Sequence, residues 1–165
     1  MTGKPSEEPL LDEAHTAFMQ RRVAINVGAR DADNVATLTR ALGCRVSADR
    51  RVVTVFVSVA RAQQLLDNVR ANGAIAVVIT RPSTHQTIQL KGTDAVITSI
   101  EESDRATIAA YVDSFVEDLA SIGYRENFAR TVLSGKDDEV VAVTFTPTAA
   151  FAQTPGPGAG ARLRA

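Results

Sequence analysis

Six arginines lie close together in the first half of the chain, with only three acidic residues over the same stretch: Arg30, Arg40, Arg45, Arg50, Arg51 and Arg61, against Asp31, Asp33 and Asp49. Guanidinium groups bind phosphate and carboxylate oxygens through paired hydrogen bonds. Arg61 is expected where a strand gives way to a helix, and the free N–H groups of a helix start also attract anions. The cluster therefore has the chemistry of a phosphate site.

The other interpretation of these arginines, which pattern alone favours, is pairing within the fold or exposure to water. Arg50 and Arg51 stand in an expected turn and are interpreted as solvated surface. The others could pair with the acidic residues of a later helix: Glu101, Glu102, Asp104, Asp113, Glu117 and Asp118. The spacing of the arginines does not decide between the two interpretations.

A second group of polar residues lies in the segment 85–92, where the side chains alternate. As a strand, this segment places His85, Thr87 and Gln89 on one face. That face could simply meet solvent, or it could line a cleft and form hydrogen bonds with a heterocyclic ligand. The alternation is consistent with both.

Self-sufficient catalytic motifs are missing from the sequence. It has no P-loop, no glycine-rich dinucleotide motif between a strand and a helix, and no nucleophile elbow around a serine. One cysteine (Cys44) and two histidines exclude an internal disulfide and argue against a self-contained metal site. No catalytic residue is therefore assigned, and an enzyme built from this chain would depend on a bound cofactor for its chemistry.

Composition places the 165-residue chain among ordinary globular proteins. Hydrophobic residues make up 45% and charged residues 22%, and the net charge of −1 gives no basic field for nucleic acid. We expect no membrane span, because no apolar run is long enough, and no signal peptide, because the first residues are polar and acidic. The expected compartment is the cytoplasm.

The elements that would position these residues follow from hydrophobic periodicity. Helices are expected over 10–20, 60–72, 103–121 and 125–133, the third capped by Ser103. Strands are expected over 23–28, 36–47 with a bend or bulge at Gly43, 52–58, 74–80, 85–92, 94–100 and 140–146. We expect a flexible arm over residues 1–9, one domain over 10–150 and a Pro/Gly-rich tail over 151–165.

The order of these elements indicates the fold class. Strands joined by hairpin-length connections favour antiparallel pairing over alternating βαβ units. We expect a mainly β fold with flanking helices (α+β), built on a small antiparallel barrel of six or seven strands. Closure of a barrel would also remove exposed strand edges.

Three segments together resemble the pyridoxamine 5′-phosphate oxidase-like, FMN-binding split-barrel family. They read ATLTRALGCRV (36–46), TVFVSVARAQQLLDNVRANGAIAVVI (54–79) and RPSTHQTIQLKG (81–92), and the similarity extends over roughly residues 15–150. The resemblance implies an FMN-dependent oxidoreductase with a small-molecule substrate. It also implies a homodimer that holds the flavin at the subunit interface.

The resemblance also assigns roles to residues. Arg40 matches a basic residue near the flavin phosphate, and Arg45 matches by spacing one that approaches the substrate. The family's phosphate-binding triplet reads Val59-Ala60-Arg61 here, so Arg61 alone is equivalent, with Ser58 nearby. Thr87 matches a flavin-contacting residue, with Gln89 on the same face.

The odd spacing of Arg40 and Arg45 would place them on opposite strand faces unless Gly43 carries a bulge. The C-terminal pattern that binds pyridoxal is absent, so we expect a different substrate. The tail is expected either to reach the partner subunit, with Arg162 or Arg164 near the flavin, or to be disordered.

Three alternatives stay open. The chain could be a non-catalytic flavin- or haem-binding sensor or carrier on the same scaffold, or a deazaflavin-dependent reductase. A barrel that binds single-stranded nucleic acid ranks below both, because that mode stacks bases on aromatic side chains in a basic groove. The expected barrel strands carry only Phe56 and Phe145.

Overall fold

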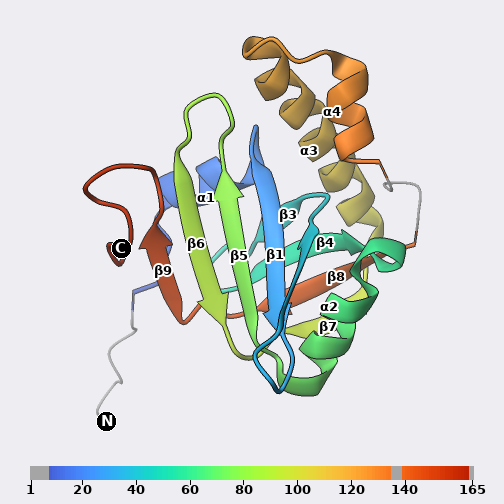
Figure 1. Ribbon diagram of the computed structural model, residues 1–165, viewed down its shortest axis with the longest axis vertical. Helices are drawn as coiled ribbons and strands as arrows, with labels where there is room; N and C mark the ends of the chain where they lie inside the picture. The colour runs from blue at the N-terminus through green and yellow to red at the C-terminus, as the bar shows by residue number, and fades with distance from the viewer. Residues whose placement is uncertain (1–7, 135–138, 164–165) are drawn as a thin grey trace.

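Runs of β-branched residues form strands in this chain, and apolar residues recurring every three or four positions form helices. The computed structural model describes residues 8–134 and 139–163 (Figure 1). Within them the helices are α1 (Glu13–Gln20), α2 (Val59–Asn72), α3 (Glu102–Ser121) and α4 (Glu126–Val132). The strands are β1 (Ala24–Arg30), β2 (Ala36–Arg40), β3 (Cys44–Val46), β4 (Val53–Ser58), β5 (Ile75–Thr80), β6 (Thr87–Gly92), β7 (Val96–Ser99), β8 (Val140–Phe145) and β9 (Ala149–Ala152).

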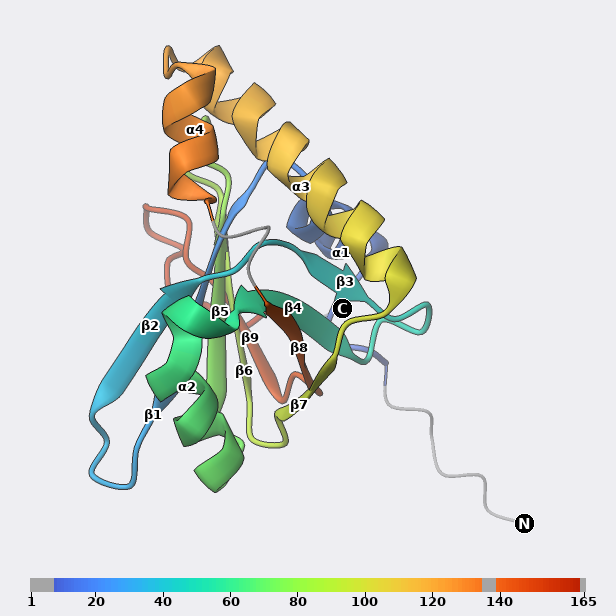
Figure 2. The same cartoon turned by 90° about the vertical axis from the view of Figure 1, so that its right-hand side faces the viewer.

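The strands form two antiparallel sheets. One has five strands in the order β2-β1-β5-β6-β9, and the other has four in the order β3-β4-β8-β7. Figure 1 shows the strands of the four-stranded sheet running across behind those of the five-stranded sheet. In Figure 2 the long helix α3 lies over the side of the molecule that carries β3 and β4. The predicted class, mainly β with flanking helices, is confirmed.

The core lies between the two sheets and under α3. On the inward face of the five-stranded sheet, the residues of the three central strands are buried, as strand alternation requires, among them Ile25, Val27, Val77, Ile79 and Leu90. Every residue of β4 is buried as well. From α3, Tyr111 packs against Gly43 and Phe56. A chain of this length buries enough apolar surface this way to need no disulfide or metal.

The outward face of the five-stranded sheet has no such cover from the described part of the chain. Its central residues, among them Asn26, Val78 and Gln89, are only half-buried. In Figure 1 no helix lies in front of β1, β5 and β6. This open face is bordered by β2 at one edge and by β9 at the other.

The structure has more strands than the six or seven predicted, for two reasons. The stretch 36–47, predicted as one bent strand, is two strands in different sheets: β2 ends at Arg40, and β3 begins at Cys44 after a buried connection through Gly43. Gly43 has a φ of 141°, a value that side chains disfavour. The second addition is β9, which pairs with β6 at the start of the predicted tail.

Two local predictions are corrected. The N-cap of α3 is Glu101 instead of Ser103, because the Asp104 carboxylate accepts a hydrogen bond from the Glu101 N–H (2.9 Å) and closes the turn earlier. The segment 94–100, expected from the sequence to extend the strand at 85–92 or to pair with it, does neither: its strand β7 pairs with β8. Residues 1–7 of the predicted arm and Arg164 lie outside the described residues. Among the described helices, none has both the length and the apolar character that crossing a membrane requires.

Candidate functional site

A pocket of about 270 Å³ lies where the end of β2, the β4–α2 junction and the end of α4 meet. It brings together three of the residues predicted to bind a cofactor, Arg40, Ser58 and Arg61. The described residues that line it are Leu38, Thr39, Arg40, Leu42, Ser58, Arg61, Val132 and Ser134. The pocket is thus polar and positively charged on part of its wall and apolar on the rest.

The position of Arg61 follows from the way β4 passes into α2. Strand β4 pairs with β8 as far as Ser58, which is the N-cap of α2 and is 2% exposed. Arg61 therefore stands in the first turn of a fourteen-residue helix, and this turn holds no acidic residue. Aligned peptide dipoles give such a helix start a partial positive charge. The dipole of α2 and the Arg61 guanidinium both favour an anion at the pocket.

Hydrogen bonds hold the two sides of the pocket together. The Arg61 Nη2 donates to the Ser134 hydroxyl (2.7 Å), which lies just beyond α4. The Thr39 hydroxyl donates to the Arg61 carbonyl (3.5 Å) and so joins β2 to α2. The bond to Ser134 orients the Arg61 side chain without neutralising its charge, and the bond from Thr39 fixes the Arg61 backbone.

Among the residues that the structure describes, no acid neutralises the charge of Arg40 or Arg61. Over residues 8–134 and 139–163, no carboxylate lies within 4 Å of either guanidinium group. Two cations at one pocket repel each other, and an anion bound between them relieves that repulsion. The pocket is therefore suited to a phosphate or carboxylate group.

Arg45 lies elsewhere. It belongs to β3 in the other sheet, and its Nε is 3.2 Å from the carboxylate of Asp104, with Glu101 at 3.9 Å. Asp104 is 1% exposed, whereas the Arg45 side chain is 41% exposed. The structure does not bring Arg45 together with Arg40; it pairs Arg45 with the acidic helix α3.

Thr87 and Gln89 lie on β6, and strand register places Gln89 on the same face as Arg40. Directly opposed residues of paired strands share a face. One row therefore crosses the whole open face: Arg40, Asn26, Val78, Gln89, Phe151 and Arg162. Three strand spacings separate Arg40 from Gln89, about 14 Å.

The polar residues of β6 are held by further hydrogen bonds. The hydroxyls of Thr80 and Thr87 lie 3.0 Å apart, and the Gln153 Nε2 donates to the Gln89 Oε1 (3.3 Å). His85, predicted on the same strand face, lies in the turn before β6 instead, with a φ of 60°. The open face therefore carries Thr87 and Gln89 without His85.

Sequence reasoning missed Asn26, Thr39 and Ser134. Asn26 interrupts an apolar strand with an amide, which is a recognisable signal. Ser134 carries none, because its contact with Arg61 joins residues 73 positions apart in the sequence. Positions of this kind depend on tertiary structure and not on local pattern.

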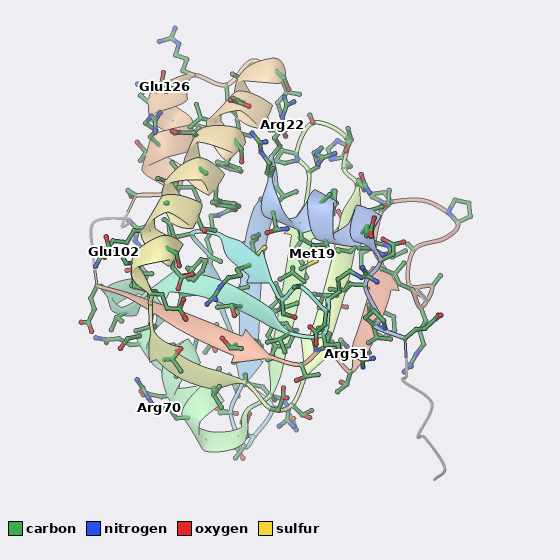
Figure 3. All side chains as sticks on the ribbon, turned by 180° about the vertical axis from the view of Figure 1, so that it is seen from behind. Met19, Arg22, Arg51, Arg70, Glu102 and Glu126 are labelled. Carbon is green, nitrogen blue, oxygen red and sulfur yellow. The ribbon has the colours of Figure 1, made fainter. Side chains whose placement is uncertain are left out.

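A larger pocket, of about 440 Å³, lies at the turn before β4 and the loop between β8 and β9. Two of its lining residues are Arg50 and Arg51, and the latter is labelled in Figure 3. Arg50 already has a structural role, since its Nε donates to the Leu11 carbonyl (3.1 Å) and its Nη1 lies 3.7 Å from Glu13. None of the six predicted cofactor-binding residues lines this pocket, so we take the smaller one as the candidate site.

Solved structures with the same fold support the architecture. An F420 reductase matches with a TM-score of 0.53 and 16% identity, over 85% of this chain and 98% of that one. HupZ of Group A Streptococcus matches with a TM-score of 0.55 and 15% identity, over 91% and 99%. A proposed pyridoxamine 5′-phosphate oxidase of Lactobacillus delbrueckii matches with a TM-score of 0.53 and 14% identity, over 92% and 100%.

These similarities confirm, at the level of the fold, the resemblance to pyridoxamine 5′-phosphate oxidase-like split barrels. Comparison of the sequence with family models and with curated proteins gives no match. Identities of 14–16% establish a shared fold and leave binding and activity to the residues of this chain.

Proposed function

We propose that this protein binds FMN and acts as a flavin-dependent oxidoreductase on a small molecule. The observation that supports it most is the pair of cations, Arg40 and Arg61, at a pocket beside the start of α2. Such a pocket suits the phosphate of a flavin nucleotide. Ser134 adds a hydroxyl group that accepts from Arg61 and keeps its own proton to donate to a phosphate oxygen.

The size of the pocket agrees with this assignment. Sites that enclose a whole ligand measure roughly 300–1,000 Å³. At about 270 Å³, this pocket has room for the phosphate end of FMN and leaves its ring outside. Beyond Arg40 lies the open face, where Asn26 and Gln89 offer amide groups that could form hydrogen bonds with the polar edge of a ring.

A second copy of the chain would complete the site. The middle of the open face is lined by small or apolar residues, including Gly28, Ala76 and Val78, and it is covered by no helix of the described chain. A flavin lying on this face would keep one side in water. We therefore propose a homodimer in which the partner covers the open face and the flavin lies at the subunit interface.

When bound, FMN would supply the transfer of electrons or hydride. The tasks left to this chain are binding and placement. Arg40 and Arg61 would neutralise the phosphate, and the amides of Asn26 and Gln89 would orient the ring. A partner subunit would exclude water. No side chain is assigned as a catalytic acid or base.

The first test is the purified protein itself. We expect a yellow preparation whose released chromophore has the mass of FMN, with a flavin that is reduced by NADH or NADPH. A chromophore with the mass of a deazaflavin would replace FMN in the proposal. Tight FMN binding without reduction would leave a carrier or sensor in place of an enzyme.

The second test is Arg61→Ala. We expect FMN to bind about 10- to 100-fold more weakly, because charge-assisted hydrogen bonds contribute roughly 1.5–3 kcal/mol. Riboflavin, which lacks the phosphate, should lose little affinity. Fluorescence titration measures both.

The matched control is Arg70→Ala. Arg70 stands near the other end of α2 and pairs with Asp67 (2.8 Å). It is labelled in the lower part of Figure 3. This variant should bind both flavins as the wild type does. Equal losses of FMN and riboflavin in Arg61→Ala would refute the phosphate role of Arg61.

A further inference from the structure

Two cations flank one aromatic ring at the β9 edge of the open face. The Lys91 Nζ lies 5.5 Å from the centre of the Phe151 ring, and the Arg162 Cζ lies 5.6 Å from it. Lys91 and Phe151 belong to the neighbouring strands β6 and β9, and Arg162 is paired with Phe151 by a β-bridge. Figure 1 shows the C-terminal segment curling back beside β9.

Glycines in the C-terminal segment allow the chain to turn back towards β9. Gly156 and Gly160 have φ values of 142° and 88°, which glycine adopts without the cost that a side chain adds. The returning chain is held by hydrogen bonds from the Gly160 N–H to the Ala152 carbonyl (2.7 Å) and from the Leu163 N–H to the Ala150 carbonyl (2.8 Å). The place of Arg162 beside Phe151 is therefore set by backbone bonds.

The charges of Lys91 and Arg162 have no acidic partner among the described residues. Across the described segments 8–134 and 139–163, no carboxylate lies within 4 Å of either group. Gln89, which opposes Phe151, is uncharged, and its amide is hydrogen-bonded to that of Gln153. Contact with the ring holds both cations in place, which lowers the entropy that a ligand must remove on binding.

These cations stand at the opposite end of the row that begins at Arg40. Four strand spacings separate Arg40 from Phe151, about 19 Å. Between the two ends lie only uncharged residues, Asn26, Val78 and Gln89. The open face thus has a cationic group at each end and a neutral middle.

We propose that Lys91, Phe151 and Arg162 bind the anionic end of the substrate, a carboxylate or phosphate attached to an apolar or ring-shaped portion. The cations contact the anionic oxygens, and Phe151 contacts the apolar portion. That this anion is a substrate rests on the proposed function, whereas the binding of an anion to these residues does not. Arg40 and Arg61 would then hold the cofactor at one end of the face while this group holds the substrate at the other.

The test compares benzoate, phenyl phosphate and the neutral benzamide, titrated into the full-length protein and followed by NMR chemical shifts. We expect both anions to bind more tightly than benzamide. Lys91→Gln and Arg162→Gln should each weaken the anions about three- to tenfold and leave benzamide unchanged. Preference for benzoate or for phenyl phosphate identifies the anionic group that the site takes.

Two further variants sharpen the result. Phe151→Leu keeps an apolar side chain but removes the π face, so we expect it to weaken the anions as well. Arg105→Gln, at an exposed arginine of α3, is the control and should change nothing. Equal binding of benzoate and benzamide, or anion binding that survives both charge-removing variants, would overturn the proposal.

The same variants separate this inference from the proposed function. Lys91→Gln and Arg162→Gln should bind FMN with wild-type affinity, because neither residue lines the Arg40–Arg61 pocket. If FMN fails to bind the wild type while the anions still depend on Lys91 and Arg162, the anion site stands and the flavin assignment falls. If FMN binds and the anions do not, the flavin assignment stands and the anion site falls.

Discussion

Cys44 lies wholly inside the protein, where its thiol donates a hydrogen bond to the Met19 carbonyl (3.1 Å). Burial raises the pKa of this thiol from 9.0 to about 12, because the thiolate would lose its hydration. Burial raises the pKa of the neighbouring Tyr111 hydroxyl in the same way. Both groups therefore stay protonated in the folded protein well into the alkaline range.

The raised pKa of the Cys44 thiol in the folded state predicts how the free energy of unfolding depends on pH. Below pH 9 the Cys44 thiol is protonated in both the folded and the unfolded state, so its contribution to the free energy of unfolding is fully present. As pH rises towards about 12 only the unfolded state loses its proton, so the free energy of unfolding falls by up to about 1.4 kcal/mol per pH unit. Chemical denaturation of the wild type and Cys44→Ala at pH 8 and pH 10.5 measures the effect. If the free energy of unfolding falls equally in the two proteins between pH 8 and pH 10.5, the thiol is excluded as the cause.

Arg45 is the residue for which a structural role and a ligand role make different predictions. Arg45→Gln leaves the buried Asp104 carboxylate without its cation, while Arg45 itself is partly exposed. We expect the variant to lose about 1–2 kcal/mol of stability and to keep wild-type FMN affinity. Urea denaturation and flavin titration of one preparation check both. Lower FMN affinity with unchanged stability would instead give Arg45 a direct part in ligand binding.

At the scale of elements, α3 is fastened to the β5–β6 turn by Asp118. This carboxylate is 1% exposed and accepts hydrogen bonds from the Ser83 N–H (3.0 Å) and hydroxyl (2.7 Å), with Arg22 at 3.7 Å. Because β6 carries Thr87 and Gln89, this contact also steadies one part of the open face.

Asp118→Ala should therefore lower the free energy of unfolding by about 2–4 kcal/mol, since it removes a buried carboxylate and leaves the N–H and hydroxyl of the half-buried Ser83 without their acceptor. The matched control is Asp113→Ala on the same helix. Asp113 is 65% exposed and pairs with Arg130 (3.2 Å), so its loss should cost less than about 1 kcal/mol. Similar urea midpoints for the two variants would contradict the anchoring role of Asp118.

Local sequence predicted most of these elements because their patterns are local. The β-branched run at 53–58, the alternation at 87–92 and the apolar stripe of α3 each determine an element by themselves. Which sheet a strand joins was not predictable, because nothing within 36–47 shows that the chain leaves one sheet at Arg40 and enters the other at Cys44. The resemblance brought Arg40 and Arg61 to one site, but only the register shows that Arg40, Gln89 and Arg162 share one row.

At the scale of the molecule, the open face is the feature that the described fold leaves incomplete. In a monomer, the residues of each strand normally alternate between apolar side chains that face the core and polar side chains that face water. Here the centre of the face holds Gly28, Ala76 and Val78 beside the uncharged amides of Asn26 and Gln89, and the cations Arg40, Lys91 and Arg162 lie towards its β2 and β9 sides. A second copy of the chain would remove this apolar centre from water, and stable interfaces of this kind bury about 800 Å² per partner.

Val78→Glu tests this role of the face. A carboxylate at its centre would have to be buried without a partner in the dimer, so we expect the variant to sediment as a monomer and to bind FMN at least tenfold more weakly. Val96→Glu is the matched control, because Val96 is 55% exposed on the four-stranded sheet. It should sediment and bind FMN as the wild type does. A wild type that sediments as a monomer while holding FMN would show that one subunit alone supports the cofactor and that the apolar centre of the face has another purpose.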